Sequence, residues 1–71
     1  MTDPDIKTAR MMLDTGDYRA AHSICMRILG RSPMAGEPYL LLGRLAADHG
    51  NHTKAIELFD RSAELGFGPA E

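Results

Sequence analysis

The sequence predicts an all-α fold in which two tandem antiparallel helical hairpins, four helices in all, stack as an α-solenoid. Three observations lead to this prediction. The chain repeats itself with a period of 34 residues, four segments carry apolar residues at three- and four-residue steps, and glycines and prolines fall at the segment ends. No segment alternates apolar and polar residues with a period of two, so no strand is predicted.

The 34-residue period is visible as identities in a single register. A helix-start proline, a turn glycine and a small packing alanine all recur, which is typical of stacked helical hairpins. The identical pairs are Pro4 and Pro38, Arg10 and Arg44, Asp14 and Asp48, Gly16 and Gly50, Ala21 and Ala55, Arg27 and Arg61, and Glu37 and Glu71. We therefore expect one domain over residues 1–71, with repeat one at about 3–36 and repeat two at about 37–70.

The first hairpin is expected to join helices at about 4–15 and 18–30. A proline suits the first turn of a helix because its missing N–H would have no partner there. Gly16 ends the first of these helices, and Asp17 can cap the second. Pro33 closes the hairpin, because the residue before a proline avoids helical geometry.

The second hairpin repeats this order of signals. Glu37 and Pro38 open a third helix, Gly50 stops it, and Asn51 replaces aspartate as the cap of a fourth helix. The fourth helix is expected to end near Gly66. A longer link, over about 32–36, joins the two hairpins.

Composition narrows the function and the compartment. The net charge is −2 and the pI is near 5.8, with lysines and arginines scattered, so nothing indicates a nucleic-acid surface. No apolar run reaches the 18 or so residues that a membrane span needs, so no membrane partner is expected. The single cysteine, Cys25, cannot form an internal disulfide, and the expected location is the reducing cytoplasm.

Several residues resemble the tetratricopeptide repeat, whose pattern combines an aromatic residue, Leu-Gly, a turn glycine, and an alanine four residues before a large apolar residue. The second hairpin carries this pattern as Tyr39, Leu42, Gly43, Gly50, Ala55 and Phe59, with Ala46 where the family has a second aromatic residue. The first carries it as Gly16, Ala21, Cys25 and Pro33, whereas its first helix departs from the pattern. The resemblance covers nearly the whole chain and implies a helical-repeat scaffold.

The resemblance also implies a binding groove, since the family lines its groove with the first helix of each repeat. That face is expected to show Asp3, Ile6, Arg10, Leu13, Asp14, Glu37, Leu40, Arg44, Ala47 and Asp48. Arg10 and Asp14 are four residues apart, as are Arg44 and Asp48, so each pair can meet on its own helix. Either this face is solvated and its charges pair with one another, or the arginines offer planar forks to a carboxylate or to peptide carbonyls.

The predicted function is therefore a non-catalytic protein–protein interaction module, with a peptide or a partner helix as its ligand. Candidate peptide-binding residues are Arg10, Asp14, Leu40, Arg44 and Asp48. No catalytic constellation and no cofactor or metal site is predicted. Cys25 and His22 lie three apart in an apolar setting with nothing to orient the histidine, and His49 and His52 lack a third ligand at a fixed spacing.

The alternative is a scaffold or oligomerisation segment of a larger enzyme. The stretch 20–29, followed by Pro33 and the 41–43 Leu-Leu-Gly, resembles repeats that precede catalytic domains in some bacterial sulfotransferases and glycosyltransferases.

The fourth helix is also expected to present apolar residues that no later helix covers, which would favour a homodimer through that helix. These residues are Ile56, Phe59, Ala63 and Leu65.

Overall fold

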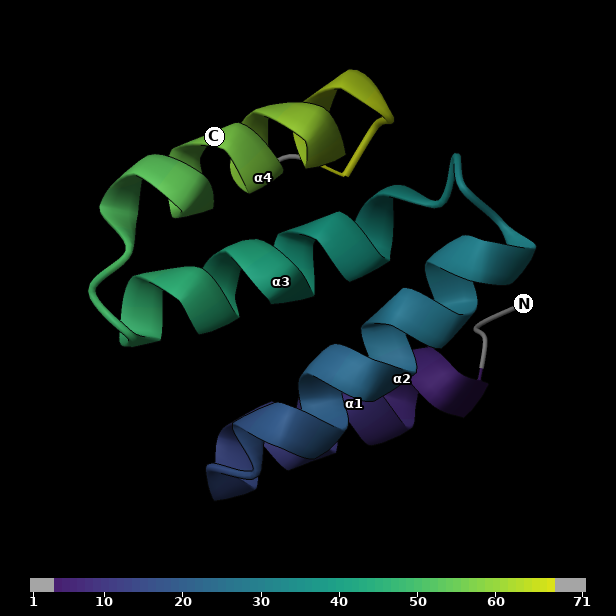
Figure 1. Ribbon diagram of the computed structural model, residues 1–71. Coiled ribbons are helices and arrows are strands. Elements are labelled where there is room, and N and C mark those ends of the chain that lie inside the picture. The colour runs from purple at the N-terminus through teal and green to yellow at the C-terminus, as the bar shows by residue number, and fades with distance from the viewer. Residues whose placement is uncertain (1–3, 68–71) are drawn as a thin grey trace.

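The computed structural model describes residues 4–67, and within that range every regular element is an α-helix. The helices are α1 (Pro4–Thr15), α2 (Tyr18–Arg31), α3 (Gly36–Asp48) and α4 (His52–Glu64). Figure 1 shows α1 lying along α2, and α3 lying along α4, with α3 in the middle of the molecule. The prediction of an all-α chain with four helices is confirmed.

The two tight turns form as local chemistry predicts. Gly16 and Gly50 adopt φ values of 89° and 77°, which glycine reaches without the steric cost that a Cβ would add. Asp17 then accepts a hydrogen bond from the Ala20 N–H at 3.2 Å. Asn51 accepts one from the Lys54 N–H at 3.4 Å, so the same cap geometry begins α2 and α4.

The boundaries between the hairpins differ slightly from expectation. Helix α2 continues to Arg31, and the Ser32 N–H donates to the Ile28 carbonyl at 2.8 Å before Pro33 breaks the helix. Helix α3 begins at Gly36, so Pro38 lies within its first turn, where no intrahelical N–H bond is required. The connecting segment is therefore residues 32–35.

Packing places α3 at the centre of the described chain. It contacts α4 along its length and also packs on both α1 and α2, whereas α4 packs on α3 alone within residues 4–67. An ion pair between Arg31 and Asp5 at 3.1 Å ties the end of α2 to the start of α1.

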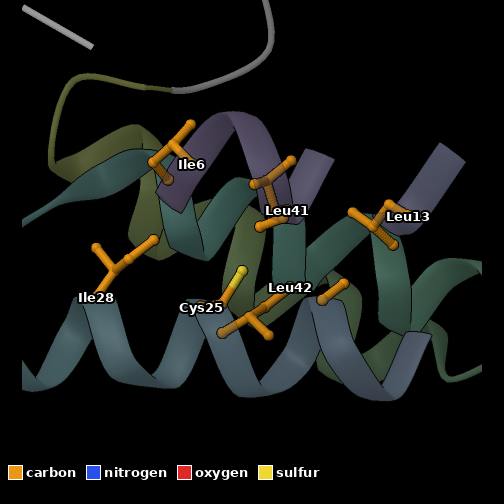
Figure 2. Close-up of a cluster of buried hydrophobic side chains, with 8 residues drawn as sticks. Ile6, Leu13, Cys25, Ile28, Leu41 and Leu42 are labelled. Carbon is orange, nitrogen blue, oxygen red and sulfur yellow. The ribbon is translucent and has the colours of Figure 1, made fainter. Parts of the chain in front are cut away.

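The main core is formed by α1, α2 and α3. Figure 2 shows Cys25 and Ile28 on one helix facing apolar side chains from the two others. The buried cluster contains Ile6, Ala9, Leu13, Ala21, Cys25, Ile28, Leu41 and Leu42. Because three separate helices contribute to one apolar cluster, its burial fixes the first hairpin against α3.

A buried serine joins α4 to the start of α3. The Ser62 hydroxyl is fully buried and lies 2.9 Å from the Gly36 carbonyl oxygen and 2.6 Å from that of Phe67. A Cβ on Gly36 would lie only 3.0 to 3.1 Å from atoms of Phe67 and Leu65. The segment that follows α4 therefore folds back over the start of α3.

Candidate functional site

Three of the five predicted binding residues meet around one surface hollow. Arg10 of α1 and Arg44 and Leu40 of α3 line a depression of about 360 Å³, together with Leu41 and Phe59. We call this depression the arginine groove. The repeat explains the meeting, because Arg10 and Arg44 are 34 residues apart and occupy equivalent places on helices that pack side by side.

The apolar wall of the arginine groove depends on a glycine. A Cβ placed on Gly43 would lie 2.7 Å from two ring carbons of Phe59, closer than real atoms approach. Gly43 is buried in the middle of α3, so the ring of Phe59 packs directly against its backbone. This close approach brings an aromatic side chain of α4 to the groove, where it is half-buried.

The arginines are held by acidic residues of the other hairpin. Arg10 donates to the Glu37 carboxylate, and the Nη2 of Arg44 lies 2.9 Å from Oδ1 of Asp14. The expectation that each arginine can meet the acidic residue of its own helix is therefore wrong, whereas the alternative that charges on this face pair with one another is what the structure shows. The physical reason is that α1 and α3 lie close enough for a long arginine side chain to reach the neighbouring helix.

This arrangement leaves both guanidinium groups accessible. The Arg10 and Arg44 side chains are 52% and 49% exposed, so each retains N–H donors that face solvent. An exposed ion pair is worth only about 0–1 kcal/mol, so an incoming carboxylate can compete with Glu37 or Asp14 for the same fork. The groove thus combines two accessible cations with an apolar surface.

Other residues predicted on this face lie elsewhere. Ile6 and Leu13 are buried in the main core, because α1 turns that side towards α2 and α3. Asp48 is exposed at the end of α3, and it is not among the groove-lining residues of the described chain. Asp3 lies outside the described residues.

Two residues gained a role that the sequence pattern did not give them. Glu37 was expected on the groove face, but its part in orienting Arg10 depends on how α1 and α3 pack. Phe59 was expected as part of the repeat signature and among the apolar residues that the fourth helix presents, but not in the groove. The sequence held one signal for this. In the 34-residue repeat, Ala9 and Cys25 of the first hairpin correspond to Gly43 and Phe59 of the second, so a glycine accompanies the larger side chain.

The lone cysteine is buried, as expected for a small apolar side chain. Burial raises the pKa of the Cys25 thiol to about 11, because the thiolate would lose its hydration. His22, three residues earlier, is exposed and is not part of the main core. Within residues 4–67, no group of three or more histidine, cysteine or acidic side chains is arranged to hold a metal ion.

No protein-family model matches this sequence, and no curated protein or solved structure matches it either. Among the described helices, none combines the length and the apolar character needed to cross a bilayer.

Proposed function

We propose that the chain is a non-catalytic interaction module of the tetratricopeptide type, acting in the cytoplasm, that binds an extended peptide in the arginine groove. The observation that carries this proposal is the convergence of Arg10, Arg44 and Leu40 around one hollow. Two planar cations beside an apolar wall suit a peptide that presents a carboxylate next to an apolar side chain. The ligand carboxylate comes from a free C-terminus or from an acidic residue.

The polar partners of the arginines support this assignment. Glu37 and Asp14 hold the two guanidinium groups from neighbouring helices, so the cations are oriented before a ligand arrives. Ordering long side chains on binding usually costs about 0.5–1.5 kcal/mol each, and prior orientation reduces that cost. Phe59 and Leu40 offer apolar area in the same hollow as the charges.

A peptide selection tests the proposal. A random peptide library with free C-termini is screened against the purified chain, and the enriched peptide is titrated by isothermal calorimetry. The double variant Arg10→Ala/Arg44→Ala should bind at least about tenfold more weakly, since two charge-assisted contacts are lost. Arg19→Ala/Arg27→Ala is the matched control, because it removes the same two charges from exposed positions on α2.

The control variant should bind like the parent protein. If the groove variant binds the selected peptide as tightly as the control does, the peptide occupies another surface and the proposed site is wrong. If neither a free carboxylate nor an acidic residue is enriched in the selected peptides, the proposed ligand chemistry is wrong.

A second candidate, self-association, is favoured by one specific feature of α4. Ile56 is 59% exposed, and Phe67, just after the helix, is 46% exposed. We infer that these side chains provide an apolar contact for a second copy, as a twofold dimer or as a scaffold element of a larger assembly. Sedimentation equilibrium at tens of micromolar should show a dimer that Ile56→Glu abolishes, whereas a monomeric parent chain contradicts the proposal.

A further inference from the structure

A second and larger cavity lies on a different side of α3 from the arginine groove. It has a volume of about 560 Å³ and runs between α2 and α4, two helices that make no close backbone contact with each other within the described chain. Its base is formed by Leu42 and Ala46 of α3. We call it the lateral cleft, and nothing in the proposed peptide-binding function uses it.

The depth of the lateral cleft follows from a difference between the two hairpins. Ala46 occupies the place in the second hairpin that Met12 occupies in the first, 34 residues earlier. The alanine methyl group fills much less space than a methionine side chain would, so the cleft extends further towards the backbone of α3. Leu45 and Leu58 extend the apolar wall on either side.

The polar residues of the lateral cleft gather at one end. His49, Asn51 and Lys54 lie where α3 turns into α4, and His22 lies in the early part of α2. The start of α2 is placed at that same end by Tyr18, whose ring meets the ring of His49 edge-on with centroids 4.7 Å apart. No aspartate or glutamate occurs among the described residues that line the cleft.

The opposite end is mainly apolar, with the Tyr39 ring and the Arg61 guanidinium at its edge. Met26 and Leu29 of α2 face this end from one side, and the guanidinium sits 5.9 Å from the centre of the Tyr39 ring. The His49 side chain is held in place at the polar end, because its Nδ1–H donates to the Leu45 carbonyl oxygen at 2.9 Å. The cleft is therefore amphipathic along its length.

We propose that the lateral cleft binds a small amphiphilic monoanion, an apolar chain or ring that ends in a carboxylate. The volume falls within the range of small-molecule sites, which are mostly apolar with a few polar groups that set orientation. In this orientation the apolar body lies over Ala46 and Leu58, and the carboxylate accepts a hydrogen bond from the Lys54 ammonium. The exposed Glu57 carboxylate, 4.0 Å from that ammonium, is a weak competitor.

Three eight-carbon probes test both the location and the charge preference. Octanoate, 1-octanol and octylammonium are titrated separately into the ¹⁵N-labelled chain, and amide shifts are followed by NMR. Octanoate should shift the amides of Leu45, Ala46 and Leu58 in a saturable manner, with about two- to fivefold higher affinity than 1-octanol. Octylammonium should bind most weakly, because the polar end of the cleft carries Lys54 and no acidic residue.

Matched variants separate the lateral cleft from other surfaces. Lys54→Gln should remove the preference for octanoate over 1-octanol, whereas Lys7→Gln, the same change at the other lysine, should leave it intact. Ala46→Met should weaken both probes at least threefold by raising the base of the cleft. Arg10→Ala/Arg44→Ala should have no effect on octanoate binding.

Several outcomes overturn the proposal. Octanoate shifts confined to Leu40, Gly43 and Phe59 would place the probe in the arginine groove. Equal affinity for the three probes would remove the charge argument, and the absence of saturable shifts would exclude the site. If Ala46→Met does not fold, the comparison of Lys54→Gln with Lys7→Gln still decides the question.

Discussion

The two hairpins solve the same packing problem with different side chains. In the first, Ala9 on α1 and Cys25 on α2 are both buried in the main core. In the second, the equivalent residues 34 positions later are Gly43 and Phe59, and the aromatic ring packs against the glycine backbone. The smaller residue on α3 makes room for the larger one on α4.

This difference affects how deeply each pair is buried. Cys25 is small enough to be fully enclosed, so the first hairpin contributes most of its apolar residues to the main core. The ring of Phe59 is too large for full enclosure, and its half-buried edge forms a wall of the arginine groove. Phe59 is therefore less buried than Cys25, its equivalent in the first hairpin, and leaves part of its ring at the groove.

The largest expected difference concerns a position that is apolar in one hairpin and polar in the other. Ile28 is buried in the main core, and Ser62 is its equivalent in α4. Ile28→Ala should lower the free energy of unfolding by about 2–5 kcal/mol, because it leaves a cavity. Ser62→Ala should lower it by only about 1–2 kcal/mol, because the single O–H that is shared between the Gly36 and Phe67 carbonyl oxygens is lost. Urea denaturation measures both, and equal losses would contradict the distinction.

The matched alanines test the close helix packing that the hairpins share. Ala21 and Ala55 are both buried. Replacing either by leucine should destabilise the protein by about 1–3 kcal/mol, because added atoms force the helices apart. Ala21→Leu should have the larger effect, since that site lies in the main core. Chemical denaturation measures these effects, and Ala20→Leu, at a half-buried position beside Ala21, is the control. If Ala21→Leu or Ala55→Leu is as stable as the parent protein, the close packing is contradicted.

The buried cysteine makes the first hairpin sensitive to alkaline pH. Burial raises the pKa of the Cys25 thiol from its ordinary 9.0 to about 11. The folded state thus disfavours the thiolate, and stability should be constant below about pH 9 and fall as the pH rises towards 11. Between pH 9 and pH 11 the free energy of unfolding should fall by about 2 kcal/mol. Denaturation experiments at a series of pH values measure this loss. Cys25→Ala should reduce this slope, and an unchanged slope would show that other groups cause it.

The glycine–phenylalanine pair of the second hairpin can be tested by a double-mutant cycle. Gly43→Ala should destabilise by about 1 kcal/mol, because the overpacking penalty of about 1–3 kcal/mol exceeds the gain in helix propensity of about 1 kcal/mol. Adding Phe59→Cys reproduces the alanine–cysteine pair of the first hairpin. The two changes should then cost less than the sum of the single changes. Strict additivity would mean that the two residues do not compensate for each other.

The sequence predicted the features that depend on neighbouring residues. Gly16, Gly50 and their capping residues determine the turns locally, so the four helices followed from residue type and spacing alone. The position of Arg10 and Arg44 on one surface followed from the repeat. By contrast, the Arg10–Glu37 and Arg44–Asp14 pairs depend on how closely α1 approaches α3, which no local pattern specifies.

The lateral cleft and the burial of Ser62 were missed for a related reason. A serine in a helix favours neither face strongly, and Ser62 is buried because the carbonyl groups of Gly36 and Phe67 meet it from other segments. The cleft depends on the separation between α2 and α4 above Ala46. Both features require knowledge of tertiary contacts, although the small residue at position 46 was visible in the sequence.

The measurement that tests the central claim most directly is an NMR titration of the arginine groove. A peptide selected for binding is added with its carboxylate intact, and then with the same carboxylate converted to an amide. The intact peptide should shift the amides of Arg10, Leu40, Arg44 and Phe59, and the amide form should bind at least about fivefold more weakly. Arg10→Ala/Arg44→Ala should abolish this difference while changing the free energy of unfolding by no more than about 1 kcal/mol per pair. Equal affinity for the two peptide forms, or shifts confined to α2, would contradict the claim that the two hairpins together form a carboxylate-binding groove.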